Sequence, residues 1–212
     1  MCPATMRSKV PVAAWVVTIG AAIPVVLALP GFFGFIGQRP GRIPFEPLHP
    51  LLGPIDISVP LFVLLYATIA VGLWHLVRSP WHLLRALQAY VILQVLRMLS
   101  LFTFTLEPPP DIIDLIDPVT QLFYPGDLPF RKDLFFSGHT ATLALLALSM
   151  PTARWRWPVW IAAFLVALAV VAQHVHWTID VLAAPVFAAL AWWSAAGTVR
   201  WSTGGRNADA SA

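Results

Sequence analysis

The segment VPLFVLLYATIAVGLWHLV, residues 59–77, contains no aspartate, glutamate, lysine or arginine. At about 1.5 Å per residue, a helix of this length spans about 28 Å, close to the hydrocarbon thickness of a bilayer. The segment therefore predicts a transmembrane helix.

The rest of the chain repeats this pattern. Of its 212 residues, 58% are hydrophobic and 11% charged, and the mean hydropathy is +0.76. These values are typical of a polytopic membrane protein. We expect an all-α fold with six transmembrane helices in one bundle, at residues 10–29, 59–77, 83–106, 134–150, 158–175 and 177–199.

These spans form a single predicted domain. Residues 1–9 are interpreted as a cytoplasmic N-terminus, residues 10–200 as the six-helix membrane catalytic domain, and residues 201–212 as a disordered cytoplasmic tail. Nothing in the sequence predicts the oligomeric state.

The distribution of Lys and Arg predicts the orientation, because cytoplasmic loops carry the excess of positive side chains. Eight basic residues fall on one side and four on the other, which places both termini in the cytoplasm, in what we expect to be a bacterial inner membrane. The cytoplasmic set is Arg7, Lys9, Arg78, Arg85, Arg154, Arg156, Arg200 and Arg206, and the opposite set is Arg39, Arg42, Arg131 and Lys132.

The net charge of +3 does not indicate a nucleic-acid partner, because the basic residues are scattered over short loops and form no patch.

Two loops are predicted on the outer side. Residues 30–58 are rich in proline and glycine, so we expect no long regular structure there. In residues 107–133, apolar residues alternate with Asp111, Asp114 and Asp117, which favours a short interfacial helix whose acids form a solvated face.

Ser137, Gly138 and His139 stand at the predicted outer N-terminus of the fourth helix. Serine can cap the helix, glycine permits close approach to the backbone, and the first N–H groups point toward a bound anion. The triplet predicts a phosphate site.

His176 and Asp180 lie four residues apart at the outer turn before the sixth helix. If the helix has begun by His176, the two side chains share one face and can touch. A carboxylate on one ring nitrogen fixes the tautomer and leaves the other nitrogen free to attack phosphorus. His139 is the candidate for the second histidine, which protonates the departing oxygen. We predict His176, Asp180 and His139 as catalytic residues.

Arg97 lies inside an apolar span, where an ionisable residue indicates function. Its guanidinium can bind phosphate in a bidentate manner. Lys132 precedes the serine and is a further candidate for the phosphate site, which would then comprise Arg97, Ser137, Gly138 and Lys132. For Arg131 we favour the interpretation of a loop charge that faces the headgroups. For His174, a packing or second-layer role outside the site and a place in the site are equally compatible with the sequence.

Two stretches, DLFFSGHT at 133–140 and HVHWTIDV at 174–181, resemble the third and fourth signature motifs of a known family. This family is the sphingomyelin synthase-like branch of the type 2 phosphatidate phosphatase superfamily. The stretch RMLSLFTFTLEP at 97–108 is similar to that branch's arginine-and-threonine helix, and the resemblance extends over residues 83–193. Lipid phosphatases of the wider superfamily carry Ser-Arg where this chain has Ala169 and Val170, which favours the synthase-like branch.

The resemblance implies a metal-independent enzyme without cofactors. In such enzymes the second histidine, here His176, carries the headgroup phosphate, the aspartate, here Asp180, orients it, and the first histidine, here His139, assists the leaving group. The expected partners are the membrane, a phospholipid donor and an acceptor such as ceramide or diacylglycerol.

Two alternatives are compatible with the sequence. A lipid phosphate phosphatase would use the same site with water as the acceptor. A transporter would use His139, His174, His176 and Asp180 as ligands for a metal ion, but helices five and six are apolar at mid-depth and no inverted repeat is evident.

Overall fold

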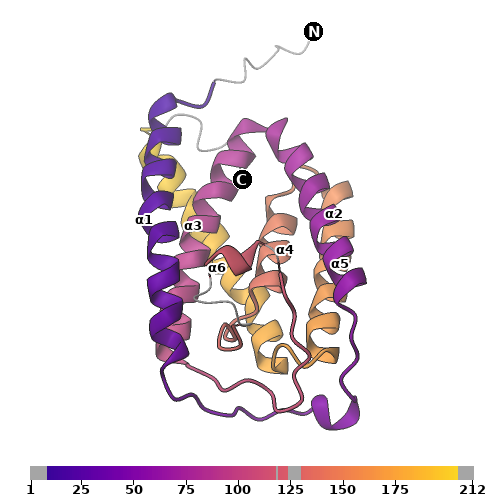
Figure 1. Cartoon of the computed structure of the whole chain (residues 1–212). Coiled ribbons are helices and arrows are strands. Elements are labelled where there is room, and N and C mark those ends of the chain that lie inside the picture. The colour runs from indigo at the N-terminus through magenta and orange to yellow at the C-terminus, as the bar shows by residue number, and fades with distance from the viewer. Residues whose placement is uncertain (1–8, 118, 124–129, 205–212) are drawn as a thin grey trace.

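The computed structural model describes residues 9–117, 119–123 and 130–204. In these ranges the protein is all-α, with α-helices connected by irregular loops and two short 3-10 helices (Figure 1). The α-helices are α1 (Val12–Gly37), α2 (Ser58–Val77), α3 (Pro80–Thr103), α4 (Gly138–Ser149), α5 (Ala153–Ala172) and α6 (Thr178–Ser202), and the 3-10 helices are η1 (His49–Leu51) and η2 (Thr120–Phe123).

The prediction of six transmembrane helices is confirmed for five. Within the described residues, α1, α2, α3, α5 and α6 are long and apolar enough to cross a membrane. The predicted span at 134–150 is wrong in length, because α4 has only 12 residues and covers about 18 Å at 1.5 Å per residue. Leu134, Phe135 and Phe136 precede this helix in a non-helical segment, and the helix begins only at Gly138.

Three predicted helix boundaries are also corrected. Helix α1 continues through Pro30 to Gly37, whereas the sequence predicted an end at residue 29. Proline removes one N–H donor but keeps a helical φ, and an apolar environment favours a continuous helix. Helix α3 begins at Pro80 instead of residue 83, and α5 begins at Ala153 instead of residue 158.

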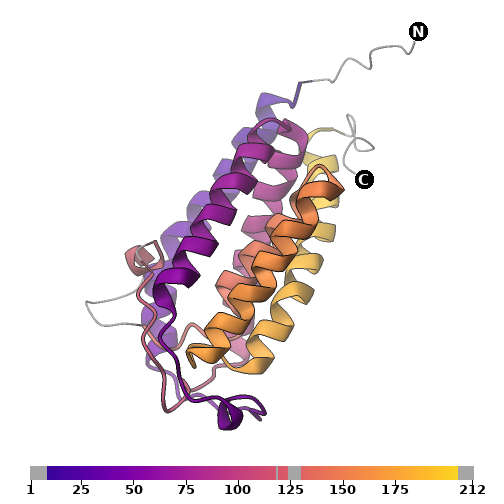
Figure 2. The same ribbon diagram turned by 90° about the vertical axis from the view of Figure 1, so that its right-hand side faces the viewer.

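The helices form one bundle in which α3, α4 and α6 pack against one another (Figures 1 and 2). Helix α1 packs on α3, and α2 packs on α5 and α4. The start of α1, the start of α3 and the end of α6 meet in a cluster of Ala14, Trp81, Leu84 and Val199. Both ends of the described chain therefore lie at the same end of the bundle, as the predicted topology requires. The tail at 205–212 and residues 1–8 lie outside the described residues.

Small side chains permit close packing at the centre of the bundle. Ala141 and Ala144 of α4 and Ala184 and Ala188 of α6 belong to one buried cluster. Such residues let membrane helices approach closely and gain van der Waals contact. This packing fixes α4, and with it His139, relative to the start of α6.

The loops at the opposite end of the bundle lie around the candidate site. Residues 38–57 have no long regular structure, as predicted. The predicted interfacial helix at 111–117 is wrong: these residues form a turn and irregular chain. Their polar groups bond to other segments instead of to one another, since the Ile113 N–H donates to the Gln173 carbonyl and Asp114 binds Arg131.

Candidate active site

A cavity of about 260 Å³ lies between α1, α2, α3 and α4 and is closed at one end by the loop that precedes α4. Its polar end contains Arg97, Asp117, Asp133, Gly138, His139 and His176. The structure thus brings four of the seven predicted site residues to one cavity wall, namely Arg97, Gly138, His139 and His176.

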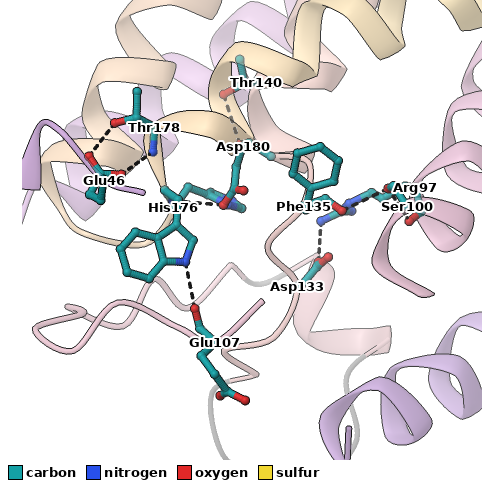
Figure 3. Close-up of polar contacts among 12 residues, drawn as sticks. Glu46, Arg97, Ser100, Glu107, Asp133, Phe135, Thr140, His176, Thr178 and Asp180 are labelled. Atoms are coloured by element: carbon teal, nitrogen blue, oxygen red, sulfur yellow. Dashed lines mark hydrogen bonds and ion pairs between the residues drawn. The ribbon is translucent and has the colours of Figure 1, made fainter. Parts of the chain in front are cut away.

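His176 contacts Asp180, as the spacing of four residues predicted. The His176 Nδ1 atom lies 3.3 Å from Asp180 Oδ2 (Figure 3), and both side chains are buried. The geometry differs from the predicted one, because α6 begins only at Thr178 and the pair does not share a helical face. Instead, Asp180 occupies the third helical position, and its Oδ2 also accepts the N–H of Trp177 at 3.0 Å, in the manner of a capping carboxylate. This leaves His176 Nε2 as the ring nitrogen for the cavity.

His139 has a carboxylate partner that the sequence did not predict. Its Nε2 lies 2.9 Å from Asp117 Oδ2, while Asp117 Oδ1 accepts the Tyr66 hydroxyl at 2.5 Å and the Val119 N–H at 2.7 Å. The expectation that Asp117 is solvated is wrong, since it is only 5% exposed. Burial alone raises the pKa of Asp117, but the hydrogen bonds from His139, Tyr66 and Val119 outweigh it and hold that pKa at about 2.

Each of the two histidines therefore contacts its carboxylate through a different ring nitrogen. His176 uses Nδ1 and His139 uses Nε2 for its carboxylate. The remaining nitrogen of His139, Nδ1, is buried without a hydrogen-bond partner within the described residues. A buried imidazole nitrogen of this kind can hold or release a proton for a bound substrate.

Arg97 faces the start of α4 and pairs with Asp133, with 2.5 Å between its Nη2 atom and Asp133 Oδ2 (Figure 3). The guanidinium also packs directly over Gly138: a Cβ atom at this position would lie 2.6 Å from Arg97 Cζ and 2.7 Å from each terminal nitrogen. Glycine at 138 is thus required for this approach, and the cation sits beside the N-terminus of α4, where an anion is favoured.

Ser137 stands at the start of α4, as predicted, but its side chain does not cap the helix, and Lys132 does not line the cavity. Ser137 is fully buried and precedes α4, but its hydroxyl donates to Thr140 Oγ1 at 3.1 Å and caps no backbone N–H. Its own N–H donates to the Asp180 carbonyl at 3.2 Å, so it ties α4 to α6. Lys132 does not line the cavity, because its ammonium binds Glu107 at 3.1 Å and the Arg39 carbonyl at 2.6 Å.

Arg131 lines the cavity instead of Lys132. Its guanidinium forms two hydrogen bonds of 2.7 Å with Asp114, and this ion pair raises the pKa of Arg131. The expected interpretation of Arg131 as a loop charge is compatible with its half-exposed side chain.

The loop at 38–57 supports the turn that carries His176. Glu46 accepts the N–H and the hydroxyl of Thr178, each at 2.7 Å (Figure 3). Burial raises the pKa of Glu46, but these hydrogen bonds and those from the Leu48 and His49 N–H groups outweigh it, so the net shift is downward. His49 stacks on His174 at a ring distance of 4.0 Å and bonds to the His176 carbonyl.

His174 thus has a packing role, one of the two interpretations of the sequence. Its Nε2 lies 2.9 Å from the Leu52 carbonyl, its φ of 55° turns the chain sharply, and it does not line the cavity. His174 and His139 therefore do not converge, and no three His, Cys, Asp or Glu side chains within the described ranges form a group that could hold a metal ion.

The sequence missed three carboxylates, Asp117, Asp133 and Glu46. Two signals pointed toward them: Asp133 opens the motif that contains His139, and Asp117 ends the stretch at 111–117 in which acidic and apolar residues alternate. No periodic pattern links Glu46 to Thr178, since they are separated by 132 residues.

Comparison with known families gives one match. Residues 132–196 match the family described as PAP2 superfamily C-terminal, whose superfamily generally comprises metal-independent lipid phosphatases and phosphotransferases. The matched segment covers about a third of the chain and contains Asp133, Gly138, His139, His176 and Asp180 but neither Arg97 nor Asp117. The chain matched none of the curated proteins and none of the solved structures with which it was compared.

Proposed function

We propose that this protein is an integral membrane lipid phosphotransferase of the sphingomyelin synthase-like type, which moves a phosphate-containing headgroup through His176. The observation that carries the proposal is the pair of histidines in one cavity wall, each held by a carboxylate on a different ring nitrogen. The match at 132–196 supports the same class of reaction.

In the first half-reaction, the Nε2 lone pair of His176 attacks the phosphorus of the donor lipid. A P–N bond forms and the P–O bond to the lipid alcohol breaks. The departing oxygen takes the proton from His139 Nδ1, so a neutral alcohol leaves and His139 becomes neutral. Asp180 keeps the proton of His176 on Nδ1, which makes Nε2 the nucleophile.

In the second half-reaction, the hydroxyl of an acceptor replaces the departed alcohol. His139 Nδ1 removes its proton, the oxygen attacks phosphorus, and the P–N bond breaks to restore His176. Asp117 stabilises the imidazolium form of His139 in both halves, because a carboxylate with a pKa of about 2 is charged at any physiological pH.

Arg97 and the start of α4 would stabilise the negative charge on the phosphoryl oxygens. The guanidinium lies over Gly138, and the first N–H groups of a helix have no acceptor within the helix. Because these donors are fixed before substrate binds, they favour the transition state with little reorganisation. Asp133 holds the guanidinium in place by its ion pair.

A lipid phosphate phosphatase is the alternative within the same chemistry, with water in place of the lipid acceptor. The cavity walls favour transfer, because Val25, Val26 and Leu29 of α1 and Leu65 and Ile69 of α2 line it with apolar surface. Apolar walls admit lipid chains and limit access of water to the phosphorylated histidine. The metal transporter has less support, since His174 lies outside the cavity.

The test is a transfer assay with purified protein in lipid vesicles. Headgroup-labelled phosphatidylcholine is supplied with ceramide, with diacylglycerol or without acceptor, and the labelled products are identified by mass spectrometry. We expect labelled product that depends on the acceptor. Labelled headgroup phosphate released into water without acceptor would support the phosphatase.

Three variants make the assay specific. His176→Ala should abolish turnover, and His139→Ala should lower it by about 10²- to 10⁴-fold, the usual contribution of a general acid. His75→Ala serves as the control, since His75 lies on α2 against Trp155 and does not line the cavity. Full activity of folded His176→Ala protein would refute the mechanism.

A further inference from the structure

The cavity continues past the histidines into the bundle, along one face of α3. Tyr90, Gln94 and Arg97 all line it, and their spacing of three to four residues places them on one side of the helix. Relative to Arg97, Gln94 lies about 4.5 Å and Tyr90 about 10 Å further from the polar end, at 1.5 Å per residue.

Helix α4 contributes a matching polar group. Thr142 lines the cavity three residues beyond His139, about one helical turn deeper, as do Tyr90 and Gln94 of α3. The polar groups of α3 and α4 therefore continue below Arg97 and His139 as a second layer, in which Gln94 and Thr142 lie about one turn deeper and Tyr90 about two turns deeper.

Gln94 stands in the middle of a membrane span, where an unpaired amide is costly. The Gln94 side chain is half-buried and lines the cavity. The hydrogen bonds found within the described residues do not include it, whereas the amides of Gln88 on the same helix and of Gln173 are bonded to other side chains. An amide retained in such a place indicates a ligand that satisfies it.

The surrounding walls indicate which ligand this is. Helices α1 and α2 stand on opposite sides of the bundle in Figure 1, and both line the cavity, to which Ala22, Val25 and Ile69 contribute apolar side chains. The cavity, about 260 Å³, is smaller than the roughly 300–1,000 Å³ that enclose a drug-sized ligand. A cavity of this size can hold the headgroup and the adjoining part of a lipid, and the apolar side chains of α1 and α2 suit the start of the lipid chains.

We propose that Gln94, with Thr142 and Tyr90, forms a subsite for the polar linkage between the headgroup and the chains of a lipid. In a glycerolipid this linkage is an ester carbonyl, and in a sphingolipid it is an amide. This inference rests on the proposed function, since it takes the phosphate to lie at Arg97 and His176. The linkage lies a few bonds below phosphorus and so falls at the second layer.

Glutamine suits both linkages, because its NH2 group donates to a carbonyl and its oxygen accepts from an N–H or a hydroxyl. An apolar side chain would accept the chains equally well but would not fix their depth. The subsite thus holds phosphorus at the level of His176.

The test removes the carbonyl from the lipid and the amide from the protein in turn. Dioleoyl phosphatidylcholine and its dialkyl ether analogue are compared as donors with one acceptor, and diacylglycerol and dialkylglycerol as acceptors with one donor. One hydrogen bond of about 1 kcal/mol to a neutral group gives the wild type about a fivefold preference in kcat/KM for the ester. An ester preference among the donors would show that the subsite binds the donor lipid, and a preference among the acceptors would show that it binds the acceptor.

Gln94→Leu should reduce this preference to about one, and Gln94→Asn should retain part of it. Val95→Leu is the matched control, because Val95 lies on the same helix and is 40% exposed on the outer surface; it should keep the preference. An ester preference that persists in Gln94→Leu, or no preference in either arm of the wild type, would overturn the proposal.

A binding measurement separates this inference from the proposed reaction. The His176→Ala protein in detergent is equilibrated with equal amounts of ester and ether lipid, and the retained lipids are measured by native mass spectrometry. Retention of the ester that depends on Gln94, without any turnover in the wild type, would reject the reaction and keep the subsite. Turnover that depends on His176 but shows no ester preference would support the reaction and reject the subsite.

Discussion

Replacing Gly138 with alanine tests whether the contact between Arg97 and α4 matters for phosphate binding. The added Cβ atom would lie 2.6 Å from Arg97 Cζ and 2.7 Å from its terminal nitrogens. Non-bonded carbon atoms prefer about 3.5–4.0 Å, so the guanidinium must retreat by about 1 Å. It is the end of a long side chain and can do so at little cost to folding.

The cost should instead appear in catalysis. A displacement of about 1 Å of a positioned group lowers rates by about 100-fold, so we expect Gly138→Ala to lower kcat/KM by about that factor in the headgroup transfer assay. The midpoint of thermal unfolding should change little, because alanine is favoured over glycine in a helix by about 1 kcal/mol.

The matched control is Gly197→Ala in α6, where a Cβ atom meets nothing within 4 Å. This variant should keep wild-type turnover and equal or exceed its stability. Wild-type kcat/KM in folded Gly138→Ala protein would refute the role assigned to Arg97. A loss shared equally by Gly197→Ala would show that the assay reports a general effect of alanine in these helices.

Two further predictions concern the carboxylates that the sequence missed. Asp117→Asn should lower kcat by about 10²- to 10⁴-fold, as in other sites where a histidine loses its orienting carboxylate. Because the folded pKa of Asp117 is held at about 2, below its ordinary value of 3.8, its charge stabilises the fold above about pH 4, and this contribution, at most about 2 kcal/mol, is lost as the pH falls toward 2. Lowering the pH from 5 to 3 should therefore lower the midpoint of thermal unfolding more in the wild type than in Asp117→Asn. An equal decrease in both proteins would contradict the assigned hydrogen bonds. Glu46→Gln should lower kcat by about tenfold with little change in KM, because a neutral amide accepts the Thr178 hydrogen bonds more weakly than a carboxylate; Glu46→Asp should recover part of the loss, and wild-type kcat in Glu46→Ala would show that the loop does not position His176.

The long helices were predictable because each depends on a local pattern. An uninterrupted apolar run of about 20 residues has few alternatives to a helix in a bilayer. The errors lie where tertiary contacts override this pattern: residues 134–136 are apolar enough for a span, yet they form the irregular wall of the site, with Phe136 fully buried and stacked on Phe187.

The prediction of an interfacial helix in the acidic loop was wrong for the same reason. Alternation of apolar and acidic residues at 111–117 favours an amphipathic helix, but Asp117 gains more from Tyr66 and His139 than from solvent. The partners are 51 and 22 residues away, and no local pattern shows such pairs.

Hydrophobic length and a spacing of four residues are local properties, so the membrane class, five of the six spans and the contact of His176 with Asp180 could be predicted from the residues alone. The tertiary structure was needed to show which nitrogen of each histidine faces a carboxylate, that Gly138 accommodates Arg97, and that Gln94 lies one turn below the proposed phosphate site. These features depend on the distance between helices that are remote in the chain, and packing sets that distance.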